Sequence, residues 1–309
     1  MKYNISFIGA GNCATRMAIA LKEAGHTIDY IYNRTDSHAD RLINSLNRIY
    51  LTNSDKTTAA TTTSTDNIND LCSSDIIIIS VSDNYVSGAV KKLASASKNH
   101  NNPSFDQDSH HHKCYIFHTS GATCIDVMKD LGENDIGYGV LYPLMTLSRS
   151  KDVNFEALPF LLEASDKETE EVLENLTSSI SKDFQFANSE KRLRMHCAAV
   201  FSCNFINYLL SMAYDVAGSW STYLMPTTIE MVRKSFLRSP DEMRTGPAVR
   251  GDMNTIHKHL ELLERLNLKE HKEVYEILTR DIMKKVQKKK NLKENTLKTN
   301  IDNSKDKEL

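Results

Sequence analysis

The chain has 309 residues, 40% hydrophobic and 25% charged, which is typical of a globular protein large enough for two domains. Its formal net charge of -2, with dense basic sequence confined to the extreme C-terminus, argues against a nucleic-acid partner. Six cysteines without a C-x-x-C spacing predict reduced thiols and a cytoplasmic location. Since no uninterrupted apolar run reaches about 18 residues, we also predict no membrane partner.

The first part of the chain alternates between predicted strands and helices. After a first apolar strand, helices are expected over 12–24, 37–49 and 84–97, and strands over 27–35, 75–83, 114–121, 137–144, 158–165 and 183–188. The unbroken apolar run in "DIIIISVSD" indicates a strand buried on both faces. This alternation predicts the α/β class, a doubly wound, Rossmann-like parallel sheet. Two polar stretches, 53–66 and 99–113, are predicted to be surface insertions.

From Ser189 onward the pattern is helical only. We expect one long helix with Ser189 as N-cap and Gly218 as its end, then helices over 226–238, 252–267 and 270–287. The predicted organisation is a Rossmann-like domain over 1–187, an all-helical domain over 188–283 and a disordered basic tail over 284–309.

The turn after the first strand has the pattern of a phosphate-binding loop. Gly9, Gly11 and Ala14 give G-x-G-x-x-A between a strand and a helix. In that setting Gly9 permits the sharp turn, Gly11 lets the backbone approach a pyrophosphate, and Ala14 lets the helix pack closely on the sheet. The pyrophosphate would lie on the helix N-terminus. The expected cofactor-binding residues are Gly9, Ala10, Gly11, Asn12 and Cys13; the alternative is a tight turn that binds nothing.

The end of the second strand indicates which dinucleotide binds. NAD sites place an Asp or Glu there for the ribose hydroxyls, whereas this chain has Asn33, Arg34 and Thr35. Arg34 can pair with a 2′-phosphate, and its two neighbours can donate hydrogen bonds to it. We therefore predict NADP as cofactor, with NAD less favoured. In the alternative, Arg34 is a solvated turn residue and Asp36 takes the place of the acid.

Further candidates follow the next two strands, where open parallel sheets bind ligands. Ser82 and Asp83 are expected to flank a ribose of the cofactor. Ser120 and the backbone around Gly121 are expected to meet the nicotinamide or the substrate. His118 could contact the substrate or donate a proton, although a single histidine at a strand end is more often structural.

The long helix carries polar residues in an apolar setting. His196, Cys203 and Asn207 follow a 0, 7, 11 spacing and so share one face of an α-helix, with Asn204 about 80° away. Buried polar groups need partners, and a cleft would supply them; alternatively, these residues only cap loops or bridge helices.

Two other stretches carry polar groups without a clear structural role. In "RTGPAVRGD" at 244–252, Thr245 and Arg250 could bind an anionic substrate group, or the loop could simply turn the chain or meet a second subunit. The triple His110, His111 and His112 is not assigned to a metal, because adjacent side chains do not converge easily on one ion.

Several motifs together resemble known bacterial proteins: "FIGAGN", "YNRT", "HTSGA", "YPLMTLS", "RLRMHCAAVFSCNFINYL" and "TGPAVRGD". They are similar to proteins that join a Rossmann-like module to a C-terminal helical domain of unknown function. That group lies within the 6-phosphogluconate-dehydrogenase-like, deazaflavin-dependent NADP oxidoreductase and pyrroline-5-carboxylate reductase proteins. The resemblance implies an NADP-binding oxidoreductase fold whose helical domain dimerises. Catalytic Lys and Asn residues of some relatives do not carry over, because His196 and Val200 occupy that region.

The predicted function is an NADP-dependent oxidoreductase that transfers a hydride to a small carbonyl or imine substrate. His196 is the expected general acid, because an imidazole can give a proton at neutral pH. Ser120 and Asn204 would orient the substrate carbonyl, and Arg250 would hold a carboxylate. His118, Asn207 and Thr245 complete the predicted substrate contacts. The alternative is a catalytically inactive NADP-binding sensor or scaffold.

Overall fold

The computed structural model describes residues 1–33, 36–52, 61–100, 113–149 and 153–305. Arg34, Thr35 and the triple at 110–112 therefore lie outside the described residues. The chain forms two compact units, Met1–Cys203 and Asn204–Leu309, and each is described by itself. The boundary falls inside the helical stretch that the sequence predicts to begin the second domain.

An eight-stranded sheet forms the first unit, in the order β3-β2-β1-β4-β5-β6-β7-β8. Its strands are β1 (Asn4–Ile8), β2 (Thr27–Tyr32), β3 (Thr63–Thr65), β4 (Ile76–Ile79), β5 (Tyr115–His118), β6 (Gly137–Pro143), β7 (Phe160–Ala164) and β8 (Phe184–Phe186). Neighbouring strands run parallel except β6 and β7, which are antiparallel. The described residues of the link between those two strands contain the 3-10 turn Phe155–Ala157 and no crossover helix, which usually connects a parallel pair. The predicted Rossmann-like α/β class is confirmed.

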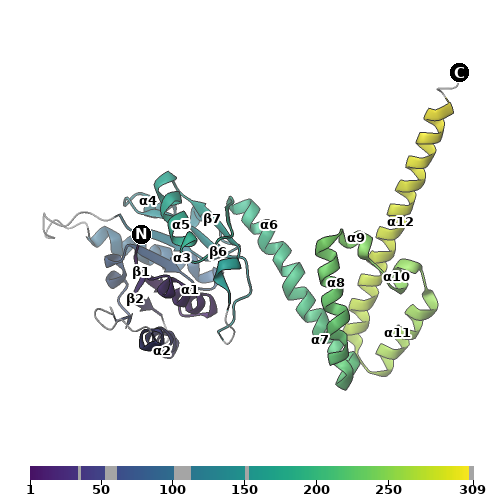
Figure 1. Cartoon of the computed structure of the whole chain (residues 1–309), viewed down its shortest axis with the longest axis horizontal. Coiled ribbons are helices and arrows are strands. Elements are labelled where there is room, and N and C mark those ends of the chain that lie inside the picture. Colours follow the sequence, from purple (N-terminus) through teal and green to yellow (C-terminus); the bar gives the residue numbers. More distant parts are fainter. Residues whose placement is uncertain (34–35, 53–60, 101–112, 150–152, 306–309) are drawn as a thin grey trace. The chain divides into compact units, whose positions relative to one another are not determined.

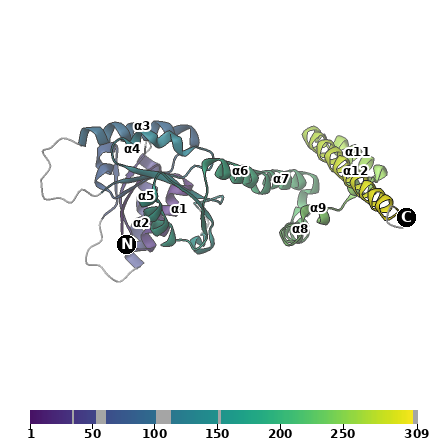
Figure 2. The same cartoon turned by 90° about the horizontal axis from the view of Figure 1, so that it is seen from above.

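Helices cover both faces of this sheet (Figure 1 and Figure 2). One apolar cluster joins the sheet to α1 (Asn12–Glu23), α2 (Asp36–Thr52) and α5 (Lys167–Ser178). The other joins it to α3 (Asp83–His100) and α4 (Lys129–Gly132). All four isoleucines of β4 are buried, as expected for a strand covered on both sides. The turns Ile68–Ser73 and Ile125–Met128 complete the unit.

Part of the predicted insertion over 53–66 belongs to the sheet. β3 pairs in parallel with β2, and the buried Thr62 hydroxyl donates to the Ile28 carbonyl at 2.7 Å. The threonine-rich composition suits an edge strand, because β-branched residues favour extended backbone. Residues 63–65 therefore lie at the surface, as predicted, but belong to an edge strand of the sheet rather than to a flexible insertion. Residues 53–60 lie outside the described part. Residues 101–112 of the second predicted insertion also lie outside the described part of the chain.

The long predicted helix is present but is not a uniform α-helix. It consists of α6 (Ser189–Ala199), a π-helical stretch over Val200–Phe205, and α7 (Ile206–Ala217). Its N-cap is Asn188 rather than Ser189, since the Asn188 side chain accepts from the Lys191 N–H at 2.9 Å. A π-helical stretch takes more residues per turn, so the shared face inferred from the 0, 7, 11 spacing is wrong.

The second unit is entirely helical. After a 3-10 stretch (Gly218–Leu224) come α8 (Met225–Leu237), α9 (Pro240–Met243), α10 (Pro247–Arg250), α11 (Met253–Arg265) and α12 (Lys269–Lys305). The predicted disordered tail is wrong, because α12 continues to Lys305. Lysine, glutamate and leucine are good helix formers, and a helix needs no apolar stripe where it is solvated. The helical run Ser189–Leu237 is long and apolar enough to cross a membrane by length and composition, with 6% of its most apolar window buried.

Candidate functional site

The glycine-rich turn is built for a ligand with a phosphate. Gly9 has φ +106°, and a Cβ there would lie 2.3 Å from the Ser80 carbonyl oxygen, so only glycine fits between the first and fourth strands. Gly11 has ordinary backbone angles and open space where its Cβ would lie. It caps α1 without a side-chain hydrogen bond, which leaves the first N–H groups of the helix for an anion.

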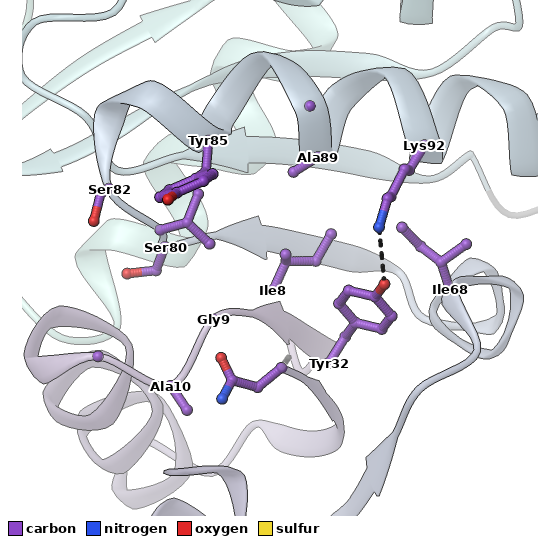
Figure 3. A pocket seen from close by; sticks show the side chains of 14 residues that line it. Ile8, Gly9, Ala10, Tyr32, Ile68, Ser80, Ser82, Tyr85, Ala89 and Lys92 are labelled. Atoms are coloured by element: carbon purple, nitrogen blue, oxygen red, sulfur yellow. Dashed lines mark hydrogen bonds between the residues drawn. The ribbon is translucent and has the colours of Figure 1, made fainter. Parts of the chain in front are cut away.

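A cavity of about 440 Å³ opens beside this turn (Figure 3). Its floor comes from the ends of β1, β2 and β4, and one wall comes from a single face of α3, on which Tyr85, Gly88, Ala89 and Lys92 follow helical spacing. Of the predicted cofactor residues, it contains Gly9, Ala10, Gly11, Asn33 and Ser82. It also contains Ile8, Tyr32, Ile68, Ser80, Val81 and the α3 face, which the sequence analysis did not select.

A second cavity of about 350 Å³ adjoins the first and shares Gly11 and the segment Ser80–Ser82 with it. It contains the remaining described cofactor candidates, Asn12, Cys13 and Asp83. It also contains Ser120 and His196, together with Thr119, Gly121, Tyr142, Pro143, Met145 and Leu147. Burial raises the pKa of the Cys13 thiol, so this cysteine stays protonated at neutral pH and acts as a spacer in the wall.

Tyr142 and His196 form a hydrogen-bonded pair at this second cavity. The Tyr142 hydroxyl lies 3.0 Å from His196 Nδ1, and the two rings meet edge to face at 5.8 Å. A Cβ on Gly121 would lie 2.7 Å from Tyr142 Cζ and 2.8 Å from His196 Nδ1, so the absence of a side chain at Gly121 permits the pair. Burial, followed by the charge of Asp83, raises the pKa of Tyr142, which keeps its hydroxyl protonated.

A buried ion pair fixes the helix that carries His196. Arg192, only 1% exposed, pairs with Glu163 of β7, and the same carboxylate accepts from the Ser189 N–H at 2.8 Å. Arg192 also donates to the Thr123 carbonyl. Because His196 lies one helical turn after Arg192, this anchor directs the imidazole toward the sheet edge.

Hydrogen bonds hold the loop after β6 against the glycine-rich turn. Arg16 of α1 donates to the carbonyls of Ser148 and Arg149, each at 2.9 Å. Arg149 in turn donates to the Ala10 carbonyl. These contacts hold Met145 and Leu147 in the wall of the second cavity. The sequence "YPLMTLS" includes both Tyr142 and this wall, but the sequence analysis used it only as part of a resemblance.

Two predicted substrate residues have structural partners. The Ser120 hydroxyl accepts hydrogen bonds from the Ala122 and Thr123 N–H groups and donates to the Thr123 hydroxyl at 2.8 Å. These contacts stabilise the loop that contains Ser120. His118 is fully buried in β5, accepts from the Ser120 N–H at 3.2 Å, and is not among the residues that line either cavity. Burial, with a smaller contribution from Arg192, lowers the pKa of His118 to about 3, so it is neutral.

The other predicted substrate residues, Asn204, Asn207, Thr245 and Arg250, belong to the second unit. All four are exposed there. The first unit thus brings together His196 with every described cofactor candidate, and these four residues remain predictions.

Two family models match separate parts of the chain. Residues 4–101 match the family of NADP oxidoreductases, coenzyme F420-dependent. Residues 158–282 match a domain of unknown function, DUF2520. Each match covers less than half of the chain. Together they confirm the resemblance stated from the motifs and the predicted enzyme class, an oxidoreductase.

Solved structures with the same fold include one clear relative. A Bacteroides fragilis protein assigned as an NADP oxidoreductase is 28% identical with a TM-score of 0.75, over 92% of this chain and 98% of its own. An Aspergillus terreus reductive aminase, solved with NADPH and ethyl-5-oxohexanoate, is 15% identical with a TM-score of 0.55, over 93% and 95%. A Coxiella burnetii pyrroline-5-carboxylate reductase is 14% identical with a TM-score of 0.50, over 93% and 98%. The last two share the fold alone. No curated protein matches the chain.

Proposed function

We propose that this oxidoreductase uses NADPH to reduce a small carbonyl or imine compound. The observation that carries the proposal is the position of the Tyr142–His196 pair in a cavity that adjoins the cavity beside the glycine-rich turn. An imine is included among the substrates because the fold is shared with a reductive aminase. The family description and the relatives support the predicted cofactor, NADP.

The residues around the glycine-rich turn fit this cofactor. The open space at Gly11 and the uncapped start of α1 suit a pyrophosphate, and the first cavity is large enough for an adenosine. Asn33, at the end of β2, would meet the ribose, and Ser82 and Asp83 would flank the second cavity. When bound, NADPH supplies a hydride.

His196 would deliver the proton that the reduced substrate needs. Because Nδ1 is bonded to Tyr142, Nε2 is the nitrogen that can face a ligand. A protonated imidazole can donate from Nε2 to a developing alkoxide while Nδ1–H donates to the Tyr142 oxygen, which holds the ring in place. For an imine, Nε2–H would instead donate its proton to the imine nitrogen, and hydride addition to the carbon of the resulting iminium would give the amine.

The test is turnover of a panel of small 2-keto acids, aldehydes and cyclic imines with NADPH, followed by variants of the pair. His196→Ala should lower turnover about 10²- to 10⁴-fold and leave NADPH affinity unchanged. His196→Asn keeps a hydrogen bond but delivers no proton, so it should be nearly as slow. Tyr142→Phe should lower turnover less, since it only positions the ring. Parent-like turnover in His196→Ala would contradict this mechanism, and NADPH binding without turnover of any substrate would favour the sensor function.

The second unit supports a further proposal, a homodimer formed through its helices in the cytoplasm. Large apolar side chains of α8 are exposed, among them Ile229 at 59% and Phe236 at 81%. A second copy is favoured over a bilayer as the cover, because the apolar run also contains Ser202, Asn204 and Asn207, which would be costly in hydrocarbon. Light scattering without detergent should give twice the monomer mass, whereas recovery in the membrane fraction would contradict the proposal.

A further inference from the structure

Lys92 and Tyr32 meet at the far end of the first cavity, across from the glycine-rich turn (Figure 3). Lys92 comes from α3 and Tyr32 is the last residue of β2, so the contact joins opposite walls of the cavity. The ammonium donates to the tyrosine hydroxyl at 3.3 Å, and its nitrogen lies 5.7 Å from the ring centroid. The aromatic residue thus holds a flexible cationic side chain over the cavity.

The contact does not neutralise the lysine. Its hydrogen-bond partner within the described residues is a neutral hydroxyl, and the ion pairs there do not include Lys92. An ammonium has three donor hydrogens, so two remain for another acceptor. The cavity therefore presents a cationic side chain that pairs with no carboxylate among the described residues.

The position of this charge fits one part of the proposed cofactor. Tyr32 directly precedes Asn33, the position at which a Rossmann sheet meets the adenosine ribose. NADP differs from NAD at that ribose alone, by a 2′-phosphate. On α3, Gly88 and Ala89 lie between Tyr85 and Lys92 and leave a smooth wall against which an adenine can pack. Lys92 lies at the far end of that wall, in contact with Tyr32, the residue that precedes Asn33.

The geometry points to Lys92 as a residue that selects NADP by binding its 2′-phosphate from the α3 side, with Tyr32 as its positioning residue. This inference rests on the proposed use of NADPH. It adds a cation on the wall opposite Asn33, from a helix whose sequence carries no nucleotide motif. Lysine suits the role because it binds phosphate as a point charge and needs no fixed fork geometry.

Binding measured by calorimetry tests the inference without turnover. The ligands are NADPH, NADH, 2′,5′-ADP and 5′-AMP, the last two being adenosine ends with and without the 2′-phosphate. Lys92→Ala should weaken NADPH and 2′,5′-ADP about ten- to a hundredfold and leave NADH and 5′-AMP within about twofold. Lys92→Arg should restore most of the 2′,5′-ADP affinity. Tyr32→Phe, which keeps the ring and loses the hydroxyl, should weaken 2′,5′-ADP by a smaller factor.

Lys91→Ala is the matched control, because Lys91 is the neighbouring lysine on α3 and does not line the first cavity. It should leave all four affinities unchanged. Equal losses for ligands with and without the 2′-phosphate would show that Lys92 contacts the adenine instead, and would overturn the inference. An unchanged NADPH preference in Lys92→Ala would overturn it as well while leaving the proposed function intact. If the parent protein binds none of the four ligands, the proposed function itself fails.

Discussion

The two units of the chain differ in how far their large apolar side chains are buried. In the first unit Phe7, Phe117 and Phe160 are at most 1% exposed, inside a sheet covered on both faces. In the second, Trp220 is 68% and Tyr223 75% exposed, and the buried apolar residues among those described are Met212, Ile256 and Leu263. A large exposed apolar surface marks an interaction site. The first unit buries its large apolar side chains in its own core, whereas the second leaves many of its own exposed. Substitutions in the two units should therefore have different effects.

The largest effect is expected at Gly9. A valine there would collide with the Ser80 backbone and strain a positive φ, so Gly9→Val should cost about 4 kcal/mol or more in the free energy of unfolding. Urea unfolding followed by circular dichroism measures this. Gly11→Val is the contrasting variant, because its side chain meets open space. It should fold normally and lose nucleotide binding; retained binding would mean that no pyrophosphate lies there.

Charge on the second unit's apolar face should change assembly more than folding. Ile229→Glu combined with Phe236→Glu places two carboxylates one above the other on α8, and burying them in a dimer would cost several kcal/mol. The variant should run as a monomer in light scattering, with the helical content of the parent. Thr227→Glu, exposed on the other side of α8, is the control and should stay dimeric. A dimer that survives the double substitution would move the interface elsewhere.

A smaller effect should follow pH, and it belongs to the first unit's core. Burial, with help from the nearby Lys2 charge, lowers the pKa of His26 from 6.5 to about 4. The ring is held between the Tyr3 N–H at 3.1 Å and the Ser179 hydroxyl at 3.0 Å. The unfolded chain takes up the proton first, so His26 stabilises the fold above pH 6.5, and this stability is lost as pH falls toward 4.

Urea unfolding between pH 7 and pH 4 measures that loss. His26 should contribute up to about 3 kcal/mol of it, since each pKa unit corresponds to about 1.4 kcal/mol. His26→Gln should be less stable at pH 7 and show a shallower pH dependence. His118, with its pKa lowered to about 3, keeps part of the slope in that variant. An identical pH slope in parent and variant would show that the pKa of His26 is the same in the folded and the unfolded protein, and would contradict this prediction.

Much of the first unit could be predicted because its signals are local. The apolar run in β4, the small residues at Gly9, Gly11 and Ala14, and the strand-helix alternation each follow from neighbouring residues. The same approach failed where the outcome depended on distant partners. β3 has a polar sequence and becomes a strand only because β2 offers an edge, and the π-helical stretch over Val200–Phe205 has no compositional signature.

By itself, the sequence determined the α/β class, the glycine-rich turn and the helical second half, because periodicity and glycine chemistry act over a few residues. Only the tertiary structure paired Tyr142 with His196 and brought Lys92 to Tyr32, contacts that join positions 54 and 60 residues apart. It also showed Ser120 folding its own loop and His118 buried, although both lie in the motif "HTSGA". Side chains at strand ends can point into a cavity or into the core, and that choice depends on packing partners that the local sequence does not contain.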